Sequence, residues 1–387
     1  MSLLTLTIYP NFLVTNNHKW RTRYANIGSH DRSSRLTNNK TSWSATSNGA
    51  APLTKLIVPS CTLLNERSDY HVTRETDEAT LELEKKRNLG FWLREWDSID
   101  ITNLCWFTGI HVLGASAPFM FDWGALWTAV GLAFMTGFGV TLGYHRLLSH
   151  RSFKIPRWLE YFFVYCGVHA LQRDPIFWVS IHKNHHMHAD TDRDPHTPTQ
   201  GFWFSHMGWF FYNNYIASKC GESRSGEYTN VPELKAQWFY RFLQDTYFCH
   251  PIALATLLYL YGGLPYLAWG MGMRAVMVLH ITFLVGSVNH LWGDRPWNTS
   301  DTSTNHWFSG LLALGDGWHN NHHAFPKSVQ HGLEWWQLDL TWELIKFLEM
   351  VGVATDVKLP TEADKKKMAL LCTNKTKKLT LGLDHDI

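Results

Sequence analysis

Nine histidines in four short clusters are the residues of this chain best suited to chemistry. In chain order they are His145 and His150, then His182, His185 and His186, then His290 alone, and finally His319, His322 and His323. Neutral imidazole is the commonest metal ligand in proteins and suits iron, zinc, copper and nickel. Nine rings are too many for one tetrahedral zinc, but they suffice for two metal ions with about four or five nitrogens each. The clusters therefore predict a redox site with two metal ions.

The spacing within the clusters differs in specificity. In the second and fourth clusters the spacing i, i+3, i+4 places all three rings on one face of a helix. His145 and His150 would stand about 140° apart on a straight α-helix, so they can reach one centre only from a helix end or a kink. Eight further histidines are interpreted as core, turn or surface residues: His111, His169, His188, His206, His250, His280, His306 and His331.

The chemistry of such a site depends on its metal. Oxidising an unactivated C–H bond requires a metal that binds oxygen and changes its oxidation state, which zinc cannot do. Two irons held by histidines alone meet this requirement. Carboxylates would then hold the rings by accepting a hydrogen bond from the second ring nitrogen. Asp190, Asp192, Asp194 and Asp316 stand close enough in sequence, although a surface or turn role fits each of them equally.

Four apolar runs without Asp, Glu, Lys or Arg surround the clusters, at residues 101–121, 124–144, 250–273 and 275–293. Each is close to the ~20 residues that cross a ~30 Å hydrocarbon core as a helix. Buried helices of a large soluble core are the alternative. Two membrane hairpins would bring all four clusters to one side, together with the basic segments that the positive-inside rule expects there. We therefore expect an all-α integral membrane protein with four transmembrane helices and a helical cap that carries the metal site.

Composition divides the rest of the chain. Residues 1–65 are rich in Ser and Thr, and the first 60 residues carry several Lys and Arg but only Asp31 as an acid. This pattern is typical of an organelle transit peptide, and a disordered polar tail is the alternative interpretation. Residues 66–98 are interpreted as a charged linker and interfacial helix, 99–360 as the membrane domain, and 361–387 as a basic disordered tail.

Charge and cysteine content argue against other classes of protein. The net charge of +2 gives no indication of a nucleic-acid partner. The 6 cysteines are scattered without a CxxC pair, so neither a disulfide framework nor a cysteine metal site is indicated.

Three of the clusters carry a family resemblance. The segments HRLLSH at 145–150, HKNHH at 182–186 and HNNHH at 319–323, arranged around two apolar hairpins, resemble the histidine boxes of the membrane fatty acyl desaturases. The surrounding residues are similar to the plant acyl-lipid and acyl-CoA branch of that family, with DRDPH at 192–196, GFWFSHMG at 201–208 and HGLEWW at 331–336. The resemblance covers roughly residues 92–360.

The resemblance implies what the site would hold. It implies two irons, bound by all nine clustered histidines, and a tunnel for a saturated acyl chain. Asp190, Asp194, Asn289 and Asp316 are the candidates for residues that support the ligands. The reaction implied is an oxygen-dependent desaturation that forms a cis double bond. Its two electrons would come from a separate ferredoxin or b-type cytochrome, because no haem-binding HPGG segment is present. With the transit-like N-terminus, the resemblance implies a palmitoyl chain on a galactolipid in a chloroplast membrane.

Several alternatives stay open. An acyl-CoA delta-9 desaturase of the endoplasmic reticulum and a histidine-box lipid hydroxylase would share the metal site. A membrane protein that only binds metal would also carry histidine clusters. An inactive desaturase homologue is a further alternative, because Gly286 stands where the family commonly has an Asn, four residues before His290. The neighbouring Asn289 lies about 60° away around a helix. Arg173 and Phe177 also replace the Gly and Asp of related plant sequences.

Overall fold

The computed structural model describes residues 90–220 and 228–369, and in these ranges the chain is helical. The extended pairings found there are three isolated bridges. The prediction of an all-α chain is therefore confirmed for the described residues. Residues 1–65, predicted as a transit peptide, lie outside them, as do most of the charged segment 66–98 and the end of the basic tail.

The first two apolar runs form α2 (Ser98–Ser116) and α3 (Trp123–Phe138), joined by the short helix η1 (Ala117–Met120). Asp97 and Asp100 start α2 with a capping box, in which each carboxylate accepts a hydrogen bond from the other residue's backbone N–H. Asp122 caps α3 by accepting a hydrogen bond from the Ala125 N–H at 2.8 Å. The helix α3 then continues into the π-helix η2 (Gly139–Ser149).

The third and fourth apolar runs differ from their predicted bounds. One helical segment, Cys249–Leu291, contains α10 (Cys249–Leu267), the π-helix η5 (Ala268–Met273) and α11 (Arg274–Leu291). Its break lies at Gly262 and Gly263, where φ is −149° and +70°, whereas Arg274, which separates the two uncharged runs of the sequence, lies inside the helical segment. Arg274 continues the helix because its guanidinium is buried and donates hydrogen bonds to the carbonyls of Gly270 and His169.

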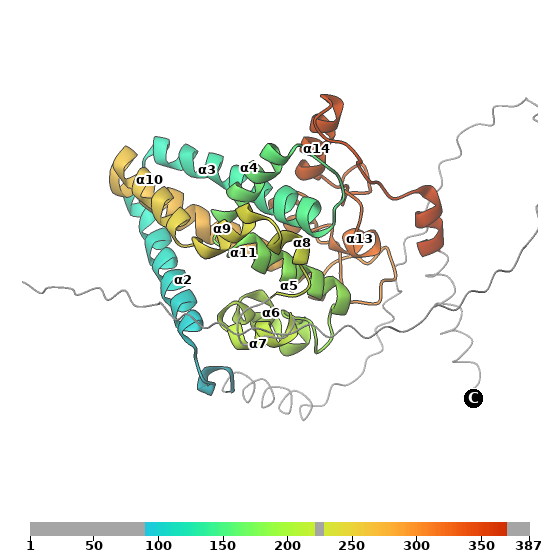
Figure 1. Ribbon diagram of the computed structural model, residues 1–387, viewed down its shortest axis with the longest axis horizontal. Helices are drawn as coiled ribbons and strands as arrows, with labels where there is room; N and C mark the ends of the chain where they lie inside the picture. The colour runs from blue at the N-terminus through green and yellow to red at the C-terminus, as the bar shows by residue number, and fades with distance from the viewer. Residues whose placement is uncertain (1–89, 221–227, 370–387) are drawn as a thin grey trace, which may run out of the picture. The chain divides into compact units, whose positions relative to one another are not determined.

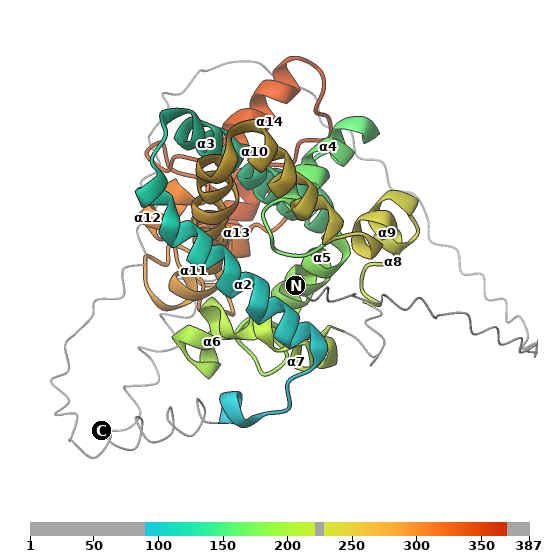
Figure 2. The ribbon, with the colours of Figure 1, turned by 90° about the vertical axis from the view of Figure 1, so that its left-hand side faces the viewer.

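Two helical segments of the described part are long and apolar enough to cross a membrane, Trp123–Ser149 with 27 residues and Cys249–Leu291 with 43. The glycine break divides the second into arms of residues 249–261 and 264–291, and α10 packs back against η5. At 1.5 Å per residue the first arm measures about 20 Å and the second about 42 Å. Figures 1 and 2 show α10 beside α2 and α3 at the end of the described part that lies away from α13.

Glycines allow the helices of this apolar bundle to touch through their backbones. A Cβ atom on Gly272 of η5 would lie 2.5 Å from the Gly114 nitrogen of α2, and one on Gly139 of η2 would lie 2.2 Å from the Gly167 nitrogen. Gly167 belongs to α4 (Arg157–Val168). Any larger residue at these positions would force the helices apart. Small residues at such crossings are typical of helix packing in membranes.

A chain of hydrogen-bonded rings connects three elements. His111 of α2 contacts His280 of α11 at 3.0 Å, and His280 contacts His206 at 2.9 Å. His206 ends α6 (Phe202–His206) and bonds Ser287 at 3.0 Å. His206 is buried and His111 and His280 are half-buried among the helices; the sequence had left core, turn and surface roles open for all three.

The other helices surround the histidine clusters or cover the bundle. They are α5 (Pro175–His188), η3 (Pro198–Gln200), η4 (Gly208–Phe211), α7 (Asn213–Lys219), α8 (Pro232–Lys235), α9 (Trp238–Asp245), α12 (Trp307–Leu312), α13 (His319–Ala324) and α14 (Leu340–Met350). Residues 362–369 are also helical, where the sequence predicted a disordered tail. Thr361 starts this helix because it and Asp364 exchange hydrogen bonds in a capping arrangement.

Candidate metal centre

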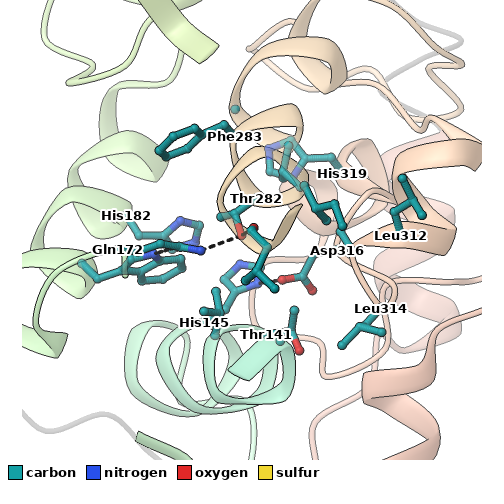
Figure 3. A pocket seen from close by; sticks show the side chains of 18 of the residues that line it. Thr141, His145, Gln172, His182, Thr282, Phe283, Leu312, Leu314, Asp316 and His319 are labelled. Carbon is teal, nitrogen blue, oxygen red and sulfur yellow. Dashed lines mark hydrogen bonds and ion pairs between the residues drawn. The ribbon is translucent and has the colours of Figure 1, made fainter. Parts of the chain in front are cut away.

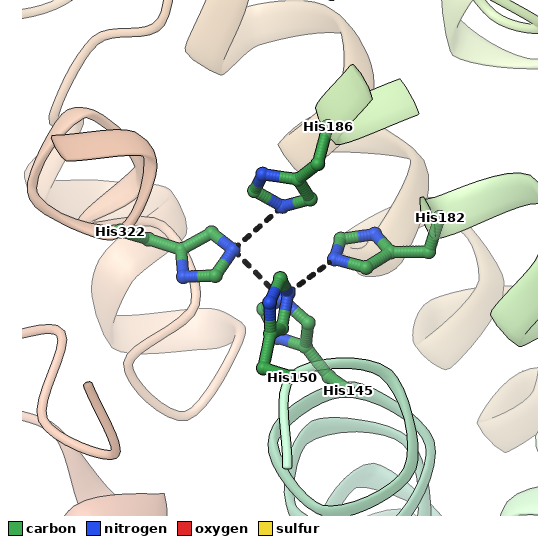
Figure 4. A group of neighbouring side chains, drawn as sticks. All are labelled: His145, His150, His182, His186 and His322. Carbon is green, nitrogen blue, oxygen red and sulfur yellow. Dashed lines mark hydrogen bonds between the residues drawn. The ribbon is translucent and has the colours of Figure 1, made fainter. Parts of the chain in front are cut away.

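The structure gathers the nine clustered histidines into two groups. The five-histidine cluster contains His145, His150, His182, His186 and His322, as Figure 4 shows. The four-histidine cluster contains His185, His290, His319 and His323. Within each cluster one nitrogen of every ring lies within 4.8 Å of those of the others. This spacing could hold one metal ion in each cluster, and it divides the predicted set into two groups.

The helices α5 and α13 each serve both clusters. On α5, His182 and His186 are four residues apart and enter the five-histidine cluster, whereas His185 enters the other. On α13 the pattern is reversed, since His319 and His323 enter the four-histidine cluster and His322 enters the five-histidine cluster. Residues i and i+4 point the same way on a helix, and residue i+3 is turned far enough to face the neighbouring site. The repeated HxxHH spacing thus places two metal sites side by side.

A π-helix explains how His145 and His150 reach the same cluster although they are five residues apart. His145 lies in η2 and His150 caps its C-terminal end, where the His150 N–H donates to the His145 carbonyl at 3.2 Å, five residues earlier. A helix with i to i+5 bonds turns more slowly than an α-helix and brings residues five apart closer to one face. Their ring centroids consequently lie 4.9 Å apart. The kink that the spacing required is thus a change of helix type.

Four carboxylates hold rings by accepting hydrogen bonds from Nδ1. Asp316 lies 2.8 Å from Nδ1 of His145, Asp194 2.9 Å from His185, Asp190 3.2 Å from His290, and Asp301 2.8 Å from His323. Three of these acids were candidates from the sequence. Asp301 was missed because it precedes His323 by 22 positions and no local spacing connects the two.

The asparagines of the HNNHH segment explain how Asp301 reaches its ring. Asn320 donates to the Trp297 carbonyl at 3.0 Å and accepts from its N–H at 2.8 Å. Asn321 accepts from the Trp297 indole at 3.0 Å and from Asn305 at 2.9 Å. These bonds pin the loop between α11 and α12 against α13, and Asp301 lies in that loop.

The charges of the carboxylates are stabilised by their histidine partners. Burial opposes ionisation of Asp190, but its bonds to His290 and Thr302 lower its pKa to about 2. Burial also opposes ionisation of Asp301, but hydrogen bonds, chiefly the one from His323, lower its pKa far below the usual value. Ionised carboxylates fix the ring tautomers, because each bonded Nδ1 must carry the proton. In the neutral form of these rings, Nε2 then carries a free lone pair.

The donor set fits metal ions. Nε2 of His185 and Nε2 of His323 face each other at 3.4 Å, and both rings hold their proton on the carboxylate side. Two lone pairs at this distance repel unless a proton or a metal ion lies between them, and either fits a site of this kind. Burial, followed by repulsion from neighbouring imidazoles, also lowers the pKa of His182, His186, His319 and His322 well below its ordinary value. Neutral rings of this kind are the form that binds metal.

Other polar residues lie where the sequence did not predict them. His331, interpreted as a core, turn or surface residue, has its ring 4.4 Å from His322 and its Nδ1 3.2 Å from Asp316. The fully buried Arg146 bonds Asp316 at 2.9 Å and lies 3.0 Å from Asp339, so it anchors the carboxylate that holds His145. The spacing within the histidine boxes predicted neither the His331 contacts nor the Arg146 contacts.

Asn289 does not face a ligand ring. Its amide donates to the Gly317 carbonyl at 2.8 Å and accepts from the Ser309 hydroxyl at 2.6 Å. Both polar groups of the side chain are thereby used to tie α11 to the segment before α13. The candidate Asn289 therefore supports the fold of the centre, and its position does not substitute for a side chain at Gly286.

A cavity of about 350 Å³ leads to both clusters. Its wall is mainly apolar and includes Phe134, Val140, Val278, Leu311 and Leu314, and His145, His182, His185 and His319 lie along it. In Figure 3, Gln172 donates across the cavity wall to Thr282 at 2.8 Å, next to His182. The Trp178 indole donates to Gln172 at 3.0 Å and fixes this pair.

The chain matches the family model described as fatty acid desaturase over residues 121–355. It is 54% identical over 288 residues to a palmitoyl-monogalactosyldiacylglycerol delta-7 desaturase, chloroplastic, from Arabidopsis thaliana, covering 74% of this chain and 76% of that protein. It is 52% identical over 295 residues to an icosanoyl-CoA 5-desaturase from Limnanthes douglasii, with coverage of 76% and 81%. Identity to a delta-9 acyl-lipid desaturase 1 from Arabidopsis thaliana is 47% over 307 residues, with coverage of 79% and 98%.

Proposed function

This chain belongs to the fatty acid desaturase family and is therefore an oxidoreductase that acts on fatty acyl chains, and we propose that its two histidine clusters bind two irons with which it desaturates a palmitoyl chain on a plastid galactolipid. The observation that carries the proposal is the apolar cavity whose wall includes rings of both clusters. An extended hydrocarbon chain in this cavity would pass directly beside the metal ligands (Figure 3).

The residues around the cavity have distinct tasks in the proposal. The apolar wall excludes water and takes up the acyl chain, so that the methylene groups are held in one position and need not be found by diffusion. The Gln172–Thr282 hydrogen bond fixes the wall beside His182. When bound, the irons supply the oxygen-dependent oxidation of an unactivated C–H bond, which no side chain can perform. Asp190, Asp194, Asp301 and Asp316 keep the rings oriented, with the proton on Nδ1 and Nε2 turned toward the metal site.

We place the chain in a membrane with four crossings arranged as two hairpins. Support comes from large apolar side chains that are exposed on the bundle helices, among them Val112 on α2, Trp127 on α3, and Leu257 and Leu260 on α10, with exposures of 64–75%. Apolar surface of this extent indicates contact with lipid or protein. The break at Gly262 and Gly263 provides the second hairpin.

The names of the relatives bear on the acyl carrier and the electron donor that we propose. Two relatives have chloroplastic names, and the first 60 residues have the composition of a transit peptide. Both support a plastid membrane and ferredoxin as donor. Relatives named for acyl-CoA substrates support the competing assignment, an acyl-CoA desaturase at the endoplasmic reticulum with a b-type cytochrome.

Expression of the full chain in a plastid-containing host that lacks palmitoyl desaturation tests the proposal. We expect a monounsaturated 16-carbon chain in the galactolipid fraction, two irons per purified chain, and no new product from a His319→Ala control. Unsaturation that first appears in the acyl-CoA fraction would favour the competing assignment, an acyl-CoA desaturase. A hydroxy acid, or purified protein without iron, would contradict desaturation by an iron centre.

A further inference from the structure

The two clusters differ by one ring. One has five histidine nitrogens and the other has four. A metal ion in the four-histidine cluster therefore has one fewer protein ligand, and a position next to it remains for a small molecule. The residues that face this position determine what it can hold.

His196 is a further histidine beside this cluster. Its ring stacks on His185 with centroids 4.4 Å apart and an interplanar angle of 29°. Asp194 orders both residues, because it accepts from Nδ1 of His185 at 2.9 Å and from the backbone N–H of His196 at 3.1 Å. The ring of His196 also lines the cavity that reaches His185 and His319. It is thus part of the same wall as two rings of the four-histidine cluster.

One nitrogen of the His196 ring lacks a hydrogen-bond partner among the described residues. This atom, Nδ1, is buried and lies 3.7 Å from the Asp194 carboxylate. A buried polar atom without a partner is costly and is usually explained by a water or ion. The ring of Trp209, 5.4 Å away, and the side of His185 offer it none.

Gly286 leaves room at this edge of the ring. A Cβ atom on Gly286 would lie 3.6 Å from Nδ1 of His196, 3.7 Å from the Ser205 carbonyl oxygen, and 3.8 Å from Cε1 of His196. All three are ordinary contact distances, so a Cβ atom would fit there, and Gly286, His196 and Ser205 all line the cavity. It has a ring nitrogen and a carbonyl oxygen on its wall and His290 one helical turn further along α11. A water needs polar partners of this kind.

We propose that His196 is a positioning residue of the centre: its imidazole holds a water molecule, in the space beside Gly286, that fills the open position of the four-histidine cluster. The inference rests on the proposed function, because it requires a metal ion in that cluster. His196 takes no proton or electron in this role. It orients the small ligand and thereby sets the coordination of one of the two ions.

Iron-57 loading of the full-length protein, followed by Mössbauer spectroscopy, tests this role separately from activity. His196→Phe keeps a ring to stack on His185 and removes both nitrogens. We expect this variant to retain two irons per chain, to show a changed quadrupole splitting at one iron only, and to lose turnover by roughly 10–100-fold, the usual range for residues that support metal ligands. Adding Gly286→Asn to His196→Phe places an amide in the open space and should restore the spectrum and part of the turnover.

His250→Phe is the matched control, because His250 contacts Tyr165, Phe242 and Thr246 and no ligand ring. It should leave both iron signals unchanged. If His196→Phe binds two irons and its spectrum is the same as that of the wild-type protein, this inference is overturned and the proposed function stays intact. Loss of iron in His196→Phe that Gly286→Asn does not restore would also overturn it, in favour of a packing role. Wild-type protein that binds no iron would refute both.

Discussion

The two histidine clusters are held in different ways. In the four-histidine cluster, three rings donate from Nδ1 to a carboxylate, namely Asp194, Asp190 and Asp301. In the five-histidine cluster, among the described residues, only His145 has such a partner, Asp316. His182 instead stacks on the Trp178 indole at 5.0 Å, and Nδ1 of His322 has no hydrogen bond. The smaller cluster is thus oriented by charge and hydrogen bonds, and the larger one by packing and by an additional ligand.

This difference predicts that the clusters tolerate ligand loss unequally. His290→Ala leaves three rings in the four-histidine cluster, whereas His150→Ala leaves four in the other, which is enough for a stable site. We expect iron to fall from two to about one per chain in His290→Ala, with activity reduced at least ~1000-fold because several kcal/mol of metal-dependent stabilisation are lost. His150→Ala should keep close to two irons. Equal losses of iron in the two variants would contradict the prediction that the clusters tolerate ligand loss unequally.

The carboxylates provide the second comparison. Asp301→Asn should weaken iron binding at the four-histidine cluster by roughly 10–100-fold, since the amide can donate a hydrogen bond and no longer fixes the tautomer of His323. Competition with a graded series of chelators measures this affinity. Asp356→Asn is the control, because its ion pair with Lys154 is exposed. An unchanged affinity in Asp301→Asn would mean that the ring is held by packing.

Acidification should act with opposite sign on two neighbouring rings, His186 of the five-histidine cluster and His185 of the four-histidine cluster. Burial and neighbouring imidazoles lower the pKa of His186, so its unfolded form binds a proton from about pH 6.5 downward while its folded form does not. Burial opposes a charge on His185, but Asp194 raises its pKa above the usual value. Protonation of His185 therefore stabilises the folded state as the pH falls toward about 6.5. Each group changes the free energy of unfolding by about 1.4 kcal/mol per pH unit in its titration range.

Melting of the iron-free protein between pH 7.5 and 5.5 tests this directly. Wild-type protein should lose stability as the pH falls, since lowered histidine pKa values predominate. His186→Gln should flatten the slope and His185→Gln should steepen it. The same slope in both variants would show that the carboxylate does not distinguish the two rings.

The smallest effect is expected at Trp178. Trp178→Leu removes the stack on His182 and the bond to Gln172, a loss of about 0.5–1.5 kcal/mol for an aromatic contact. We expect a few-fold lower kcat/KM and slightly weaker iron binding in the five-histidine cluster, measured by the same chelator series. A larger loss of iron than in Asp301→Asn would reverse the comparison between packing and carboxylates.

Local spacing predicted some contacts of the centre and could not predict others. Asp194 and Asp316 lie within a few residues of a histidine box, and both hold a ring in the structure. His331 and Asp301 reach the centre only because the segments around α13 fold back onto it. The third and fourth apolar runs were separated at Arg274 because a charged residue normally ends an apolar run, whereas here backbone carbonyls satisfy the buried guanidinium and the helix continues.

The sequence by itself determined that this chain is helical, that it carries long apolar segments, and that nine imidazoles are available in boxes with helical spacing. These properties depend on neighbours within a few residues along the chain. Only the tertiary structure decided which ring joins which cluster, because that depends on how α5 and α13 face each other and on the π-helical turn at η2. It also decided which rings receive a carboxylate, since loop closure brings together residues that no local pattern relates.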